Sequence, residues 1–112
     1  AMILGKPVIG KGYSGNMDFM TNDNAMLVDH SLIPVPKNAY PRWENQVWAD
    51  PDVEQASRYM ESLYDDPDLC RRLGARASLT IRRDFSYVAT GVRYRTRVEE
   101  LCRQRDGLQV PA

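Results

Sequence analysis

The sequence predicts an α/β fold in which a few short parallel strands are followed by three helices. Two short apolar runs, residues 6–10 and 25–29, are bounded by turn residues and contain the β-branched side chains typical of buried strands. Three later segments begin with a capping residue and continue with apolar residues at helical spacing. With 43% hydrophobic and 27% charged residues, the 112-residue chain suits one small globular domain spanning residues 1–112.

The first thirty residues predict two strands separated by a glycine-rich loop and a brief helix. Residues 1–4 followed by Gly5 are typical of the last turn of a helix with a glycine C-cap, so we expect most of that helix to lie before residue 1. Between the two strand runs, Ser14 or Asn16 can cap a brief helix over residues 17–20. On this interpretation the chain begins in the middle of a larger domain.

Residues 31–50 predict an irregular segment. Prolines occur at Pro34, Pro36 and Pro41, and proline does not fit a helix interior. The aromatic residues of the segment favour a packed loop or an irregular hairpin over a flexible linker. These aromatic residues are Tyr40, Trp43 and Trp48. They could stack on a sugar ring, but in a proline-bearing loop they more often fasten the loop to the core.

The rest of the chain predicts three helices. Asp50 and Asp66 each stand before a proline and a further acidic residue, which is the pattern of an N-cap and a first helical turn, and Ser86 can cap the third helix. Each helix has apolar positions at helical spacing, which predicts a buried face. These positions are Val53, Ala56, Met60 and Leu63 in the first helix, Leu69, Leu73, Ala77 and Ile81 in the second, and Val88, Val92, Val98 and Leu101 in the third.

Composition and charge exclude several classes of function. Fifteen basic and fifteen acidic residues give no net attraction to nucleic acid or to an anionic membrane, and no apolar run is long enough to cross a bilayer. Cys70 and Cys102 lie far apart, which favours a reduced, cytoplasmic setting and no metal site. Ten arginines in the helical part raise a nucleic-acid hypothesis, but interleaved acidic residues favour a solvated helix surface. The arginines are Arg71, Arg72, Arg76, Arg82, Arg83, Arg93, Arg95, Arg97, Arg103 and Arg105.

Several blocks of the sequence resemble one enzyme family. Residues 1–9 (AMILGKPVI) and 12–20 (GYSGNMDFM) are similar to consecutive blocks of the retaining GT-B glycosyltransferases of the family 4 type. Residues 27–29 (LVD) and 48–52 (WADPD) resemble the next strand and helix start, and 65–67 (DDP), 73–74 (LG) and 84–86 (DFS) resemble the closing helices. The resemblance implies a partial Rossmann-like C-terminal domain of GT-B type, which binds a nucleotide-sugar donor in the full-length enzyme.

The resemblance also implies that the isolated chain is inactive. In this family a pair of glutamates contacts the donor sugar and ribose, and the second glutamate directly precedes the Ala-Met that matches Ala1 and Met2. Both glutamates would therefore lie outside residues 1–112, as would the N-terminal domain on the acceptor side. Glycosyl transfer needs the leaving phosphate neutralised and the donor held in place. We therefore expect no catalytic residue, no metal and no cofactor in this chain.

A cleft-lining loop follows the first strand. Residues after the carboxyl ends of strands face the ligand crevice in open α/β sheets, so backbone amides near Ser14 could line the donor or acceptor cleft. The alternative is a tight turn that needs glycine only for backbone freedom. The candidate residues are Gly12, Tyr13, Ser14, Gly15 and Asn16. Lys6 and Lys11 could meet phosphate oxygens, although a solvated position is favoured for both, and His30 is interpreted as a surface histidine.

Three functions remain open from the sequence. The first is a transferase part that works only in the full-length enzyme, the second a non-catalytic interaction module or remnant, and the third a nucleic-acid-binding helical domain. The first two share the fold, whereas the third requires salt-sensitive binding to DNA or RNA. A Rossmann-like sheet cut partway exposes a strand edge and an apolar face, so we expect the chain to form a homodimer.

Overall fold

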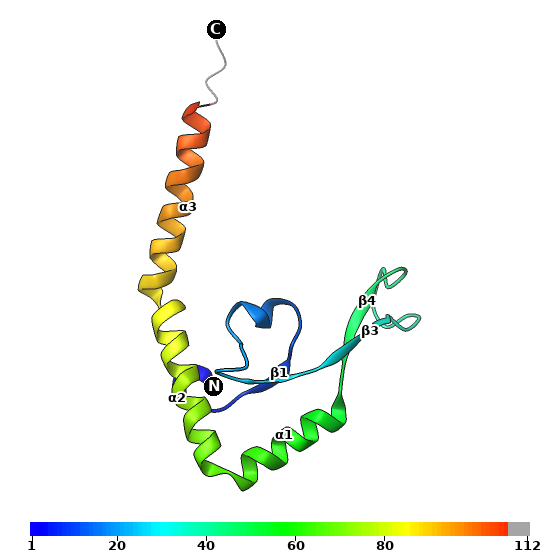
Figure 1. Cartoon of the computed structure of the whole chain (residues 1–112). Coiled ribbons are helices and arrows are strands. Elements are labelled where there is room, and N and C mark those ends of the chain that lie inside the picture. Colours follow the sequence, from blue (N-terminus) through cyan, green and yellow to red (C-terminus); the bar gives the residue numbers. More distant parts are fainter. Residues whose placement is uncertain (108–112) are drawn as a thin grey trace.

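The computed structural model describes residues 1–107, which form a mixed α/β chain with two small sheets (Figure 1). The α/β class predicted from the sequence is confirmed. In chain order the elements are η1 (Met2–Leu4), β1 (Ile9–Lys11), η2 (Ser14–Asp18), β2 (Met26–Val28), β3 (His30–Pro34), β4 (Val47–Pro51), α1 (Val53–Asp65), α2 (Pro67–Asp84) and α3 (Tyr87–Gly107). The two short elements labelled η are 3-10 helices. Within residues 1–107, none of the helices combines the length and the apolar character needed to span a membrane.

Strands β1 and β2 form a parallel pair, as the sequence predicts. Ile9 is paired with Met26 and Lys11 with Val28. The pairing continues by one hydrogen bond at each end, because Met26 N donates to Val8 O and Gly12 N donates to Val28 O, both at 2.9 Å. The carboxyl ends of both strands therefore lie side by side.

Strands β3 and β4 form an antiparallel hairpin that rises from the end of β2. His30 is paired with Pro51 and Pro34 with Val47, and the loop of residues 35–46 joins the two strands. Of the two predicted alternatives for this segment, the hairpin is confirmed. The hairpin adds an antiparallel pair to the parallel β1–β2 pair, because a loop that returns the chain at the same end of a sheet joins antiparallel strands.

Two of the three predicted helix caps are confirmed. Asp66 Oδ1 accepts a hydrogen bond from Leu69 N at 2.8 Å, and Ser86 Oγ accepts one from Ala89 N at 3.1 Å. The predicted cap of α1 is wrong by two residues: Asp52, not Asp50, accepts from the backbone of the first turn. Strand β4 continues through Pro51 and carries Asp50 in its ladder, so the helix cannot begin before Asp52.

Helix α2 packs against the N-terminal part of the small core. Leu73 and Ala77 are buried, and Ala77 packs with Met2, Met20 and Ala25. Gly74 faces Gly5 so closely that a Cβ at Gly74 would lie 2.0 Å from Gly5 O. Gly5 has a φ of 70° and caps η1, which confirms the predicted glycine C-cap.

The apolar face predicted for α3 is not buried, and that of α1 is covered only in part, since Ala56 and Leu63 are half-buried. Val53 and Met60 of α1 are 73% and 61% exposed, and the four apolar positions of α3 are between 47% and 77% exposed. The structure shows why: α3 runs on from the end of α2 and projects away from the sheets (Figure 1). Helical spacing identifies the apolar side of a helix but does not supply an element to cover it.

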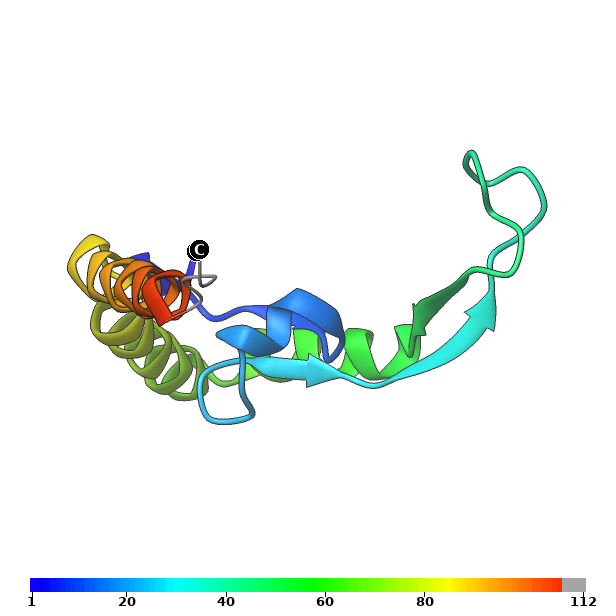
Figure 2. The same ribbon diagram turned by 90° about the horizontal axis from the view of Figure 1, so that it is seen from above.

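The chain is therefore an open, thin assembly. Its principal extents are 70 × 41 × 18 Å and its radius of gyration is 20.1 Å. A compact domain of this length has a radius of gyration of about 13 Å. Seen from above, the hairpin loop and the helices α2 and α3 lie at opposite ends of the molecule, with β1 and β2 between them (Figure 2).

Candidate functional site

The predicted cleft loop, Gly12–Asn16, follows β1 and lies at the carboxyl end of the parallel pair. Gly12 N is bonded to Val28 O at 2.9 Å, and Tyr13 N donates to Lys11 O at 2.8 Å. Asn16 Nδ2 also donates to Lys11 O, at 3.1 Å. These three bonds fix the path of the loop relative to the ends of both strands.

The backbone of this loop corrects two sequence-based interpretations. Ser14 and Asn16 do not cap η2, because η2 begins at Ser14, its N-cap residue Tyr13 makes no side-chain cap bond, and the Asn16 amide bonds back to β1. Among the described residues, the left-handed backbone of the loop occurs at Ser14, with a φ of 62°, and at neither glycine. A Cβ at Gly15 would meet nothing within 4 Å, so the surface of the loop is open there.

A cluster of Lys11, Tyr13 and His30 joins the loop to the hairpin. Lys11 Nζ donates to Ala49 O of β4 at 2.8 Å and lies 5.7 Å from the centroid of the Tyr13 ring. The Tyr13 and His30 rings are 4.9 Å apart at an interplanar angle of 59°. Lys11 and His30 were interpreted as surface residues, but both are half-buried and contact other side chains or backbone.

The sequence alone did not predict this cluster, although pairing the two predicted strands in parallel would have indicated it. Lys11 is paired with Val28 in the parallel ladder, so residues just after the two strands become neighbours. Applied to the two predicted strand ends, this rule places Tyr13 near His30. The other predicted lysine, Lys6, lies before β1 and therefore at the opposite edge of the sheet from the loop.

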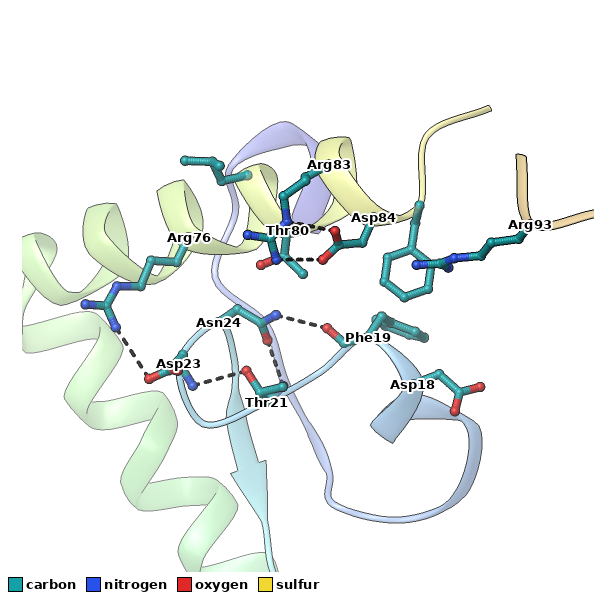
Figure 3. A pocket seen from close by; sticks show the side chains of 12 residues that line it. Asp18, Phe19, Thr21, Asp23, Asn24, Arg76, Thr80, Arg83, Asp84 and Arg93 are labelled. Atoms are coloured by element: carbon teal, nitrogen blue, oxygen red, sulfur yellow. Dashed lines mark hydrogen bonds and ion pairs between the residues drawn. The ribbon is translucent and has the colours of Figure 1, made fainter. Parts of the chain in front are cut away.

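A second candidate site is a hollow of about 740 Å³ between α2, the start of α3 and the chain that connects η2 to β2 (Figure 3). Its lining includes three arginines, three aspartates and the rings of Phe19 and Phe85. The charged members are Arg76, Arg83, Arg93, Asp18, Asp23 and Asp84. The formal charges of these six side chains cancel.

Interactions within the hollow occupy its arginines. Arg83 Nε and Nη2 each donate to a different oxygen of Asp84 at 2.7 Å, and this hydrogen bonding lowers the pKa of Asp84 below its ordinary value. Arg76 forms an ion pair with Asp23 at 3.6 Å, and the guanidinium of Arg93 lies 5.2 Å from the centroid of Phe85. An anionic ligand would have to displace these partners, so the hollow does not favour phosphate binding.

The polar floor of the hollow is also internally satisfied. Asn24, which is 2% exposed, donates to Phe19 O at 2.9 Å and accepts from Thr21 N at 2.8 Å (Figure 3). Its amide thus holds the turn before β2 in shape. We assign a structural role to this hollow and retain the loop after β1 as the candidate site.

The remaining helix arginines mostly bond to groups of their own surface. Arg58, Arg71, Arg95 and Arg97 each pair with an acidic residue three or four positions away, and Arg82 donates to Ile3 O at 3.2 Å. Exposed pairs of this kind contribute little stability but neutralise the surface. The pattern favours the solvated-surface interpretation over a nucleic-acid interface.

The described part of the chain contains no arrangement of side chains suited to metal binding or to thiol chemistry. Residues 1–107 contain no group of three or more His, Cys, Asp or Glu side chains placed to hold a metal ion. Cys70 is half-buried and its Sγ donates to Leu63 O at 3.0 Å, while Cys102 is exposed on α3.

No protein-family model, curated protein or solved structure matches this chain.

Proposed function

We propose that this chain is the C-terminal part of the nucleotide-sugar-binding domain of a retaining GT-B glycosyltransferase. The full-length enzyme would transfer a sugar from a nucleotide-sugar donor to an acceptor, and the isolated chain would be inactive. The proposal is supported by the resemblance of residues 1–29 to family blocks and by one structural observation. That observation is the parallel β1–β2 pair with the Gly12–Asn16 loop, which is open at Gly15, at its carboxyl end.

The position of the loop suits a ligand crevice. Ligands of open α/β sheets bind beyond the carboxyl ends of the strands, where loops rather than strands supply the contacts. Ser14 and Gly15 begin a short helix, so their amides lack the intrahelical partners that later amides have. In a Rossmann-like half of GT-B type, these groups would contact the donor or the acceptor rather than perform the chemistry.

The open construction of the sheet supports the view that the chain functions within a larger protein. A parallel sheet is normally covered on both faces. The β1–β2 sheet has two strands, so each strand also has one edge that is not paired with another strand. Beside β1 lies an apolar groove of about 470 Å³, lined by side chains that include Met2, Val8, Phe19 and Ile81. Additional strands and helices of a complete domain would cover both the edge and this groove.

The test reads the source DNA upstream of Ala1 and compares residues 1–112 with the product of any longer reading frame found there; the absence of such a frame would also contradict the proposal. Both proteins are purified and incubated with UDP-glucose and GDP-mannose labelled in the sugar, and released nucleotide and transferred label are measured. We expect turnover by the longer protein and none by residues 1–112. Turnover by the chain alone would contradict the proposal, as would a longer frame without a glutamate directly before Ala1.

A second candidate function, an interaction module, is favoured by the exposed apolar residues of α3. Tyr94, Val98 and Leu101 are 70%, 56% and 47% exposed and lie on one side of the helix at spacings of three and four residues. Exposed apolar faces of this kind often mark protein contacts. On this basis we also propose a homodimer of the isolated chain, which light scattering across micromolar concentrations would refute by showing a monomer throughout.

A further inference from the structure

The β3–β4 hairpin is physically joined to the candidate site. Lys11, directly before the Gly12–Asn16 loop, donates to Ala49 O in β4, and Tyr13 of the loop contacts His30 at the start of β3. The base of the hairpin is closed by the bond from Asp52 N to Asp29 O at 2.9 Å. The hairpin surface therefore continues the candidate site away from the sheet.

The aromatic residues of the hairpin do not fasten it to the main core, which was the favoured interpretation of the sequence. The loop is instead closed on itself, by bonds of 3.0 Å from Val35 N to Gln46 O and 3.1 Å from Gln46 N to Trp43 O. Its end lies far from the helices α2 and α3 (Figure 2). Tyr40 and Trp48 remain 43% and 39% exposed.

Trp48 has hydrogen-bonding neighbours on its own face of the hairpin. Alternate residues of a strand share a face, so Asp50 lies beside Trp48 on the same face of β4. Gln46 directly precedes β4, and its backbone O accepts a hydrogen bond from Val35 N at 3.0 Å, which continues the ladder by one residue and places Gln46 on the other side of Trp48. Across the ladder Trp48 is paired with Ile33. The side chains of Gln46, Trp48 and Asp50 are all exposed. The face thus presents one aromatic ring between an amide and a carboxylate.

We propose that this face of the hairpin, centred on Trp48 and flanked by Gln46 and Asp50, binds a saccharide. A pyranose ring has an apolar C–H face that packs on an aromatic ring, and its hydroxyl groups project from the rim towards hydrogen-bonding side chains. An amide and a carboxylate on either side of an indole match that distribution. The further assignment of this saccharide as the acceptor rests on the proposed function, whereas the binding itself does not.

The experiment uses the whole chain and reads Trp48 directly. The sequence has two tryptophans, so the Trp43→Phe variant leaves Trp48 as the only indole. This variant is titrated with maltohexaose, cellohexaose, chitohexaose and mannohexaose, and Trp48 fluorescence is recorded. Saturation-transfer NMR on the sugar protons measures the same binding without the indole. We expect a saturable change with at least one hexasaccharide.

Substitutions then locate the site. We expect Trp48→Ala to weaken binding at least about tenfold, because the stacking surface is lost, and Trp48→Phe to retain part of the affinity. Tyr64→Ala is the matched control, because Tyr64 is an aromatic residue of α1 that is 87% exposed and lies outside the hairpin. It should bind as the parent chain does. If circular dichroism shows that Trp48→Ala does not fold, Gln46→Ala and Trp48→Phe provide the comparison.

Three results would overturn the proposal. One is the absence of a saturable change with any of the four sugars. Another is unchanged affinity in a folded Trp48→Ala variant or, where that variant does not fold, in both Gln46→Ala and Trp48→Phe. The third is equal loss of affinity in Tyr64→Ala, which would mean a contact elsewhere. Failure of nucleotide-sugar turnover by the longer protein, with saccharide binding retained, would reject the transferase function and leave this site in place.

Discussion

Replacement of Gly74 by alanine tests the close approach of α2 to the backbone of Gly5. A Cβ at position 74 would lie 2.0 Å from Gly5 O and 2.7 Å from Gly5 C. Both obstructing atoms belong to the backbone, so no side-chain rotation can make room. Gly5 is itself held, because its N–H donates to Met2 O at 2.9 Å and its φ of 70° is a conformation that favours glycine. Helix α2 must therefore move away from η1 by more than an ångström.

The expected loss combines two opposing effects. Overpacking that forces a backbone shift costs about 1–3 kcal/mol, and the rigidity of this contact favours the upper end. Alanine regains about 1 kcal/mol of helix propensity over glycine. We expect the free energy of unfolding to fall by about 2 kcal/mol.

Gly91→Ala supplies a control with the opposite sign. Gly91 also lies inside a helix, α3, but a Cβ there would meet nothing within 4 Å. The same substitution should therefore stabilise the chain by about 0.5–1 kcal/mol. Urea unfolding followed by circular dichroism measures both variants. A Gly74→Ala variant as stable as the parent chain, or a loss of equal size in Gly91→Ala, would refute the close-contact argument.

Further predictions concern a helix cap, an ion pair and the base of the hairpin. Asp66→Ala should lower the free energy of unfolding by about 1 kcal/mol, measured in urea, because the first turn of α2 loses its cap. The hydrogen bonds from Arg83 hold the pKa of Asp84 below its ordinary value, so the pair stabilises the fold above that ordinary value and the contribution is lost as the pH falls through the lowered pKa. Arg83→Gln should raise that pKa, as measured by NMR titration of the carboxyl carbon. Lys11→Met should increase amide exchange in β4 by about tenfold, because the bond to Ala49 O is lost.

Local chemistry explains which elements the sequence could predict. The cap at Asp66, the proline after it and the αL glycine at Gly5 act within a few residues, and all three occur as predicted. Asp50 shows the limit of such reasoning, because its own neighbours fit a helix start. Asp50 instead pairs with β3, a strand about twenty residues earlier in the chain, and so belongs to β4.

Long-range packing accounts for the rest. The apolar spacing in α3 is real, but no described element covers Val98 or Leu101. For the candidate site, the sequence placed Tyr13 correctly after a strand but treated His30 as an isolated surface residue. Their contact depends on the parallel register of β1 and β2, which composition and periodicity of single segments do not encode.

The thinness of the chain has a thermodynamic consequence. Its accessible surface is 8806 Å², whereas a compact monomer of the same mass exposes about 6,300 Å². Heat capacity of unfolding and denaturant sensitivity both scale with the surface that unfolding exposes. The isolated chain should therefore unfold with an unusually small heat-capacity increment and a shallow urea slope for 112 residues. A protein that covers the apolar faces of the chain would increase both the heat-capacity increment and the urea slope. Calorimetry can therefore detect such a partner as a sharper melting transition.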